Sequence, residues 1–155
     1  MKKDIRSVVF VCLGNICRSP MCESIMTYLL KQNHLDYIKV DSLGTSYEEY
    51  GNPVHSGTKR VLYEHKIPCI PHRADKISAK DYEKYDLIVA LDSSNVRNLL
   101  RIFGSDKDDK IRLLLSFVSL DRDVADPWWT GDFETTFEDC YKGCSGLIDY
   151  IKNQK

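Results

Sequence analysis

Residues 11–20 read Val-Cys-Leu-Gly-Asn-Ile-Cys-Arg-Ser-Pro, so that Cys12 and Arg18 are separated by five residues in one short loop. Residues 7–11, Ser-Val-Val-Phe-Val, predict a strand buried on both faces of a parallel sheet. An amphipathic helical pattern follows at once, and Pro20 suits its first turn, where a missing N–H costs nothing. Such a helix N-terminus offers unpaired N–H groups and the positive end of a dipole. The stretch therefore predicts an anion-binding loop at the end of a strand.

The side chains of this loop suit a phosphate group. The planar guanidinium of Arg18 matches two phosphate oxygens at once. The positive field around Cys12 favours its thiolate, which is a nucleophile. An isolated cysteine and arginine at this spacing would be a small buried residue and a surface charge. The preceding strand, Gly14 inside the loop and the helix after it favour a catalytic phosphate loop instead.

The rest of the chain alternates between strand and helix patterns. Short apolar runs predict three further strands, at residues 38–41, 87–90 and 111–115. Apolar residues at helical spacing predict a helix after the loop and three more, at residues 53–66, 93–103 and 132–151. Alternation of this kind implies right-handed crossovers and a parallel sheet. We expect an α/β three-layer sandwich, with a four-stranded parallel sheet flanked by helices on both faces, in one domain over residues 1–155.

Helical periodicity also assigns the buried faces. In the helix at 93–103, Leu100 is expected to face the core beside Leu99, and Gly104 ends the helix. In the last helix, Tyr141 is expected on the same apolar stripe as Cys140. Cys12 would lie at the carboxyl end of the first strand, where ligands bind in sheets of this kind.

Composition limits the possible partners. The chain has 155 residues, with 22 Lys and Arg against 23 Asp and Glu, and this net charge of −1 offers no general attraction for nucleic acid or an acidic membrane. No apolar run is long enough for a membrane span or a signal peptide. The six cysteines include no Cys-x2-Cys pair, which argues against a zinc site and favours reduced thiols. We expect a cytoplasmic protein without metal or other cofactor, nucleic-acid partner or membrane insertion.

The loop resembles the phosphate-binding loop of the low-molecular-weight protein tyrosine phosphatases. The resemblance continues through most of the chain, in Asp41-Ser42, Gly51-Asn52-Pro53, Asp92-Ser93-Ser94-Asn95 and Asp126-Pro127. It implies hydrolysis of phosphotyrosine and aryl phosphate monoesters through a cysteinyl-phosphate intermediate. The partners would be tyrosine-phosphorylated proteins, with phosphate and other oxyanions as inhibitors.

The departing phenolate of such a substrate needs a proton, which a carboxylic acid can supply. Asp126 lies in a loop after the fourth predicted strand, and Asp121 and Asp123 are neighbouring candidates. The resemblance of Asp126-Pro127 to the family motif favours Asp126 as the general acid, with Cys12 as nucleophile.

The resemblance also implies roles around the phosphate. Asn15 would shape the loop through side-chain bonds to Ser42 and Asp92, although an ordinary turn residue is the alternative. Ser19 would either cap the helix or steady the thiolate. The substrate-binding set implied in this way is Leu13, Gly14, Asn15, Ile16, Cys17, Arg18 and Ser19, with Trp128 and Trp129.

Cys17 resembles a resolving thiol, able to form a reversible disulfide with Cys12 under peroxide. Its other interpretation is a packed loop residue. Neither His65 nor His72 is required by the expected mechanism.

Aromatic and acidic residues are the candidates for the mouth of the site. Trp128 and Trp129 follow Asp126, and planar side chains there suit an aryl phosphate, although they could also pack the loop onto the body. Glu48 falls where relatives often carry a wall-forming aromatic residue, between Tyr47 and Tyr50. Which of these residues forms the second wall stays open.

Other activities share parts of this sequence pattern. A thiol-dependent arsenate reductase needs two relay cysteines in the middle of the chain, where Cys69 stands alone. A phosphoarginine phosphatase resembles this loop with threonine at the position of Ile16. A phosphotyrosine-binding module or a cysteine phosphocarrier has no need of Asp126 as a proton donor. A nucleotide-binding loop would carry Gly-Lys-Ser/Thr, which is missing here.

Overall fold

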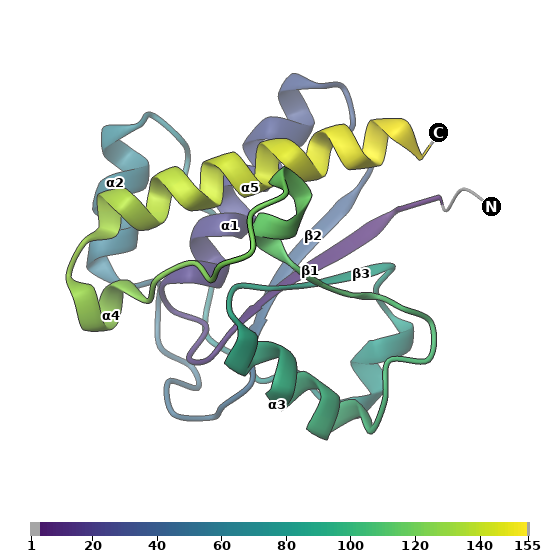
Figure 1. Ribbon diagram of the computed structural model, residues 1–155. Helices are drawn as coiled ribbons and strands as arrows, with labels where there is room; N and C mark the ends of the chain where they lie inside the picture. Colours follow the sequence, from purple (N-terminus) through teal and green to yellow (C-terminus); the bar gives the residue numbers. More distant parts are fainter. Residues whose placement is uncertain (1–3, 155) are drawn as a thin grey trace.

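The four predicted strands form one parallel sheet in the computed structural model, which describes residues 4–154 (Figure 1). The sheet order is β2-β1-β3-β4. The strands are β1 (Ser7–Cys12), β2 (Lys39–Gly44), β3 (Leu87–Ala90) and β4 (Ile111–Leu113). The expected four-stranded parallel sheet is therefore confirmed.

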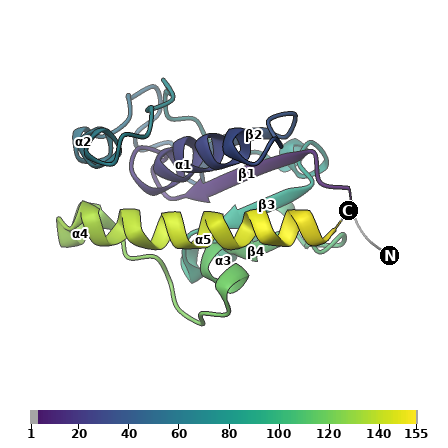
Figure 2. The same cartoon turned by 90° about the horizontal axis from the view of Figure 1, so that it is seen from above.

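Helices cover both faces of this sheet, as the three-layer prediction requires. In Figure 1, α1 (Arg18–Gln32), α2 (Ser56–Glu64) and α5 (Phe133–Asn153) lie above the strands, and α3 (Ser93–Phe103) lies below them. Figure 2 shows α5 as one long straight helix that runs beside the sheet. The short helices are η1 (Ala79–Glu83), η2 (Leu114–Val118) and α4 (Pro127–Thr130).

Side-chain alternation in β1 divides the core between these layers. Val8 and Phe10 belong to the large apolar cluster that α1 and α5 complete. Val9 and Val11 belong to a second cluster on the opposite face, with Leu99 of α3. Successive side chains of a strand point to opposite faces, so a wholly apolar strand such as β1 fits only between two covered faces.

The structure shortens the last predicted strand. Residues 111–115 were expected to be extended, but β4 ends at Leu113, and η2 begins at Leu114. A side chain at Gly143 of α5 would collide with Leu114, so glycine at this position lets η2 pack directly against the helix. The close packing of η2 on α5 replaces the last two residues of the expected strand.

Two residues expected in the core are exposed. Leu100 is 40% exposed and Tyr141 is 39% exposed. Each follows a fully buried residue, Leu99 or Cys140, and one step along a helix turns the side chain by about 100°.

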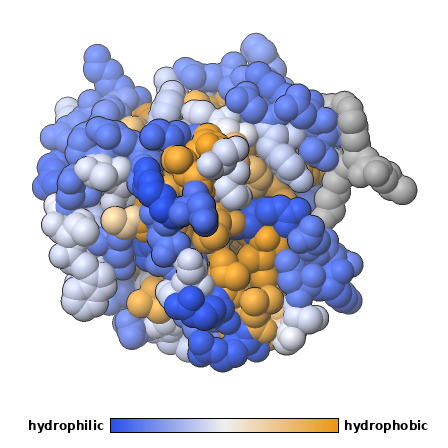
Figure 3. Space-filling model, viewed as in Figure 1, coloured by the Kyte–Doolittle hydropathy of each residue, from blue (hydrophilic) through white to orange (hydrophobic). Residues whose placement is uncertain are grey.

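The face in Figure 3 is mostly hydrophilic, with apolar residues gathered near its centre, between α5 and α3. No helix among residues 4–154 is long and apolar enough to cross a membrane.

The sheet order places a crevice at the end of β1. Chain connections run from β1 to β2 on one side and return to β3 on the other side, so the strand order reverses at β1. Loops that leave the carboxyl ends of β1 and β3 separate there and leave room for a ligand. Cys12 is the last residue of β1, and Asp92 lies shortly after the end of β3.

Candidate active site

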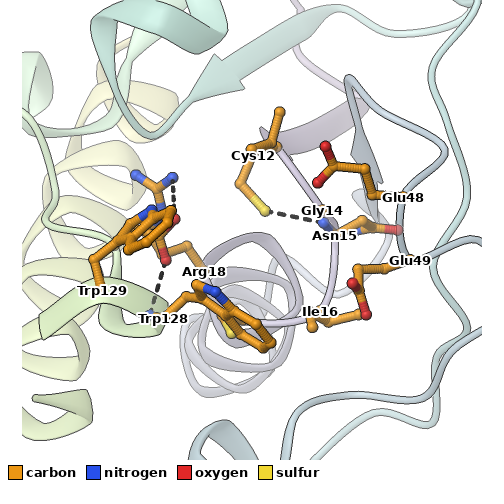
Figure 4. Close-up of a pocket in the computed structure, with 12 residues that line it drawn as sticks. Cys12, Gly14, Asn15, Ile16, Arg18, Glu48, Glu49, Trp128 and Trp129 are labelled. Atoms are coloured by element: carbon orange, nitrogen blue, oxygen red, sulfur yellow. Dashed lines mark hydrogen bonds and ion pairs between the residues drawn. The ribbon is translucent and has the colours of Figure 1, made fainter. Parts of the chain in front are cut away.

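A cavity opens at this reversal point of the sheet (Figure 4). Three segments surround it, namely the loop after β1, the loop after β2 and the start of α4. Figure 4 shows Glu48 and Glu49 on the side opposite Trp128 and Trp129. The lining residues are Cys12, Leu13, Gly14, Asn15, Ile16, Cys17, Arg18, Glu48, Glu49, Asp126, Trp128 and Trp129. Of the substrate-binding set expected from sequence, Ser19 alone does not line the cavity.

The Cys12 sulfur has two hydrogen-bonding neighbours. The Asn15 N–H donates to Cys12 Sγ at 3.3 Å, and Ser19 Oγ lies 3.0 Å from the same sulfur. Ser19 Oγ also accepts a bond from the Asn15 side chain at 2.9 Å, which leaves the serine proton free to point at the sulfur. Both neighbouring groups can therefore donate a hydrogen bond to this sulfur. Ser19 therefore lies behind the Cys12 sulfur, outside the lining of the cavity.

Asn15 is the central residue of the loop. Its backbone has a φ of 62°, a left-handed conformation that asparagine tolerates better than most residues, and it is 1% exposed. Its Nδ2 donates to Ser19 and Ser42, and its Oδ1 accepts from His72 Nε2 at 2.7 Å and from the Asp75 N–H at 2.9 Å. Every hydrogen-bonding position of this amide is occupied, which holds the loop in shape.

One expected partner of Asn15 was wrong. Ser42 contacts Asn15 as expected, but Asp92 does not, because its Oδ2 accepts a bond from Arg18 at 2.8 Å. Asp92 instead caps α3, where its Oδ1 accepts from the Asn95 N–H at 2.8 Å. The second carboxylate oxygen is thereby left to Arg18, and His72 takes the place that the sequence assigned to Asp92.

A buried polar group behind the loop was missed in the sequence. Ser42 donates to Glu23 Oε1 at 2.8 Å, and Glu23 Oε1 lies 3.6 Å from His72 Nδ1. Burial raises the pKa of Glu23 to about 7 and lowers the pKa of His72. His72 therefore favours its neutral form at neutral pH, and Glu23 keeps its proton up to a pH of about 7. No local motif announces this pairing, because Glu23 lies on α1 and His72 lies in a distant loop.

Arg18 is anchored to the protein by hydrogen bonds from one of its nitrogens, Nη1. It is 3% exposed, and its Nη1 donates to Asp92 Oδ2 and to the Val124 carbonyl, both at 2.8 Å. Although burial opposes the change, the negative charges of Cys12 and Asp92 raise the pKa of Arg18 above its ordinary value. Because Nη1 has two hydrogens, both are used in these bonds, and the Nε and Nη2 hydrogens remain for an anion.

Asp126 lines the same cavity. It ends the stretch of residues 119–126, which we call the acid-bearing loop. It caps α4, where its Oδ1 accepts from the Trp128 N–H at 3.0 Å, and its Oδ2 lies 3.5 Å from Arg18 Nη2. Of the three candidate acids in this loop, only Asp126 lines the cavity. Asp123 is bound to Ser93, and Asp121 is exposed.

The walls of the cavity differ in character. Trp128 and Trp129 are 57% and 81% exposed, and the ring of Trp128 meets His55 edge-on at 5.8 Å. Glu48 and Glu49 form the opposite wall. The sequence left open which residue near position 48 forms this wall, and the structure places two carboxylates there.

Cys17 lines the cavity as a free thiol. Burial, reinforced by the negative charge of Cys12, raises the pKa of Cys17 to about 12. Cys17 is therefore protonated near neutral pH. Within residues 4–154, no cluster of three or more histidine, cysteine or acidic residues is suited to hold a metal ion.

Comparisons with known proteins agree with this geometry. Residues 7–155 match the family model described as low molecular weight phosphotyrosine protein phosphatase. The chain is 42% identical over 144 residues to the low molecular weight protein-tyrosine-phosphatase PtpA of Staphylococcus aureus, covering 93% of this chain and 92% of that protein.

Solved structures show the same fold. YfkJ from Bacillus subtilis superposes with a TM-score of 0.93 at 36% identity, covering 100% of this chain and 99% of that one. A low molecular weight protein tyrosine phosphatase from Streptococcus pyogenes superposes with a TM-score of 0.84 at 36% identity, with coverage of 95% and 93%. A protein tyrosine phosphatase from Entamoeba histolytica with Hepes in its active site superposes with a TM-score of 0.88 at 26% identity, with coverage of 95% and 97%.

Proposed function

The chain belongs to the low molecular weight phosphotyrosine protein phosphatase family, whose named relatives are protein-tyrosine phosphatases and therefore hydrolases, and we propose that it hydrolyses phosphotyrosine and aryl phosphate monoesters through a cysteinyl-phosphate intermediate. The observation that carries the proposal is that one cavity is lined by Cys12, Arg18 and Asp126. A nucleophile, a phosphate-binding cation and a proton donor are the three groups that the reaction needs.

In the first step, the Cys12 thiolate attacks phosphorus, and the bond from phosphorus to the tyrosine oxygen breaks as the sulfur–phosphorus bond forms. Arg18 and the loop N–H groups hold the other phosphate oxygens, whose charge they stabilise in the transition state. The Asp126 carboxyl gives its proton to the departing phenolate oxygen. Phosphate takes the Nη2 side of Arg18 that faces Asp126 in the free protein, which leaves Asp126 beside the leaving group.

In the second step, water attacks the cysteinyl phosphate. The Asp126 carboxylate accepts a proton from this water, the sulfur–phosphorus bond breaks, and inorganic phosphate leaves. Ser19 and the Asn15 N–H stabilise the thiolate that is released, because both lie within hydrogen-bonding distance of Cys12 Sγ.

The walls favour an aryl phosphate. Trp128 and Trp129 offer planar surfaces on which the ring of phosphotyrosine can stack, and Ile16 adds an apolar side chain to the lining. The proposed substrates are accordingly tyrosine-phosphorylated proteins, with phosphate and related oxyanions as inhibitors that occupy the same loop.

We also include Cys17 in the proposal, as a resolving thiol. Hydrogen peroxide would oxidise Cys12 to a sulfenic acid, and the Cys17 sulfur would then form a disulfide with it as water leaves. Loss of thiol-reversible inactivation in Cys17→Ser would support this role, and unchanged recovery would contradict it. The six free cysteines support a reducing, cytoplasmic location.

Hydrolysis of phosphotyrosine and of aryl phosphates by the wild type, Cys12→Ser and Asp126→Ala tests the proposal. We expect Cys12→Ser to lose turnover by more than about 10⁴-fold while it still binds inorganic phosphate. Asp126→Ala should lose most of its kcat/KM on phenyl phosphate and little on dinitrophenyl phosphate, whose leaving group needs no proton. Cys69→Ser, a half-buried thiol outside the cavity, is the control. Turnover by Cys12→Ser would overturn the mechanism.

A further inference from the structure

The segment that leads to Asp126 has no regular backbone hydrogen bonding of its own. Residues 119–126 belong to no helix or strand, and Asp121, Arg122, Asp123 and Ala125 are exposed. A loop of this kind is held in place only by contacts to the rest of the molecule. Those contacts therefore decide where the Asp126 carboxyl lies.

Four consecutive residues of the segment are tied to other elements. Asp123 binds the start of α3 through Ser93. Val124 donates its N–H to the Leu91 carbonyl and accepts from Arg18. The remaining two ties both lead to α5, where Arg122 binds Asp139 and the Ala125 carbonyl accepts from Thr136.

The ion pair between the loop and α5 is short and bidentate. Arg122 Nη1 and Nη2 bind Asp139 Oδ2 and Oδ1 at 2.8 and 2.9 Å, a bidentate arrangement that fixes direction as well as distance. The Asp139 side chain is 8% exposed, and that of Arg122 is 49% exposed. A carboxylate buried to this degree needs a charged partner, and the partner comes from the acid-bearing loop.

The Arg122–Asp139 ion pair and the Thr136 hydrogen bond attach the loop to the same face of α5. Thr136 and Asp139 are three residues apart on α5, and so lie on one face of that helix, one turn apart. Their partners, Ala125 and Arg122, are also three residues apart in the loop. One face of α5 thus holds both ends of the four-residue stretch that leads directly to Asp126.

We propose that Arg122 and Asp139 are positioning residues for the proton transfer, since their bidentate pair fixes the loop on α5 so that Asp126 meets the leaving-group oxygen. The inference rests on the proposed role of Asp126 as general acid. Neither residue is among those that line the cavity. Their loss should therefore act only on the step that needs the proton, and only as strongly as the leaving group needs it.

A leaving-group series tests this inference. The readout is kcat/KM for phenyl, p-nitrophenyl and dinitrophenyl phosphate, because this quantity reports the step in which the ester bond breaks. Arg122→Met should lose about tenfold on phenyl phosphate, a loss typical of a misplacement below 1 Å, and less than about twofold on dinitrophenyl phosphate. Arg122→Lys, which keeps the charge but not the fork, should fall between Arg122→Met and the wild type.

A double variant separates positioning from folding. Arg122→Met alone leaves Asp139 buried without a partner and can unfold the protein, whereas Arg122→Met with Asp139→Leu removes both charges. We expect the double variant to keep a thermal midpoint near that of the wild type and still to show the loss on phenyl phosphate. Arg112→Met is the matched control, because Arg112 makes a bidentate pair with Asp109 beside β4. It should leave the whole series unchanged.

The outcomes are distinct. Loss that grows with the basicity of the leaving group in the double variant supports the inference. An equal loss on all three substrates, or no loss, overturns it and leaves the proposed function intact if Asp126→Ala still depends on the leaving group. A flat series for Asp126→Ala itself would overturn the acid role and the inference together.

Discussion

The two loops that meet at the cavity are held in different ways. In the loop after β1, Ser19, Asn15 and Arg18 are 0%, 1% and 3% exposed. In the segment that leads into α4, Trp128 and Trp129 are 57% and 81% exposed, and most of residues 119–126 are exposed as well. Most of the first loop is buried, with Leu13 exposed, whereas the second lies on the surface and is held at a few points.

This difference divides the work of the site. In the proposed mechanism, the loop after β1 holds the phosphate, whose shape is the same in every substrate, so a rigid loop suits it. In the same mechanism, the segment around Asp126 meets the leaving group and its protein, which vary from one substrate to another. Changes in the first loop should therefore affect both catalysis and folding, and changes at the second should affect catalysis and leave folding nearly unchanged.

Asn15→Ala should produce the largest effect, because it breaks the buried network in the first loop. The change leaves His72 Nε2–H and the Asp75 N–H without their acceptor and keeps a non-glycine residue at a φ of 62°. We expect kcat/KM on phosphotyrosine to fall roughly 10²-fold and the free energy of unfolding to fall by about 2 to 4 kcal/mol. Steady-state kinetics and urea unfolding measure the two quantities.

Asn15→Gly separates the two causes, because glycine adopts a positive φ freely but restores no side-chain bond. Kinetics as poor as those of Asn15→Ala would place the effect in the hydrogen-bond network. Wild-type kinetics in Asn15→Gly would show that the network does not matter and would break the comparison on its first side.

The contrast between the loops also explains what the sequence could predict. The strand, the turn and the helix that form the first loop are contiguous, so local patterns were enough to place Cys12 and Arg18 at the end of β1. The predicted bond between Asn15 and Asp92 was wrong because a carboxylate near a strand end has several possible partners within reach. Which neighbour it binds depends on how α3 is capped.

Contacts between distant elements left no local signal. Glu23 faces inward from α1, and only the fold brings it to Ser42 and His72. Asp139 occupies a helix position where an acidic residue is normally solvated, and the pairing with Arg122 appears only once η2 and the following loop are folded against α5. Position in the sequence was enough to propose Cys12 as the nucleophile and Asp126 as the acid, but not to find the residues that contact them.

Glu23→Gln tests whether burial behind the first loop makes stability depend on pH. The pKa of Glu23 is about 7, against an ordinary value of 4.5, so the folded protein holds this proton more tightly than the unfolded chain. The stabilisation is complete below pH 4.5 and is lost as the pH rises through about 7. For the wild type, we expect this group to lower the free energy of unfolding by about 2 to 3 kcal/mol over that range.

In Glu23→Gln this part of the pH dependence should disappear, which urea unfolding at several pH values measures. Glu64→Gln on α2, an exposed glutamate, is the matched control and should follow the wild type. Parallel curves for Glu23→Gln and the wild type would show that Glu23 titrates normally, and that burial behind the loop has no effect on stability.

Trp129→Ala should have the smallest effect, because it changes the surface side of the site. Trp129 is 81% exposed, so its removal should alter the free energy of unfolding by less than about 0.5 kcal/mol. Loss of a stacking surface for the substrate ring should raise KM for a phosphotyrosine peptide about threefold, a loss within the range of one aromatic contact, with kcat unchanged. Tyr63→Ala on α2 removes an aromatic side chain of similar exposure, 83%, away from the cavity, and should change neither quantity. A drop in stability for Trp129→Ala would mean that the tryptophan packs the loop instead of meeting the substrate, and the surface side of the site would then resemble the buried side.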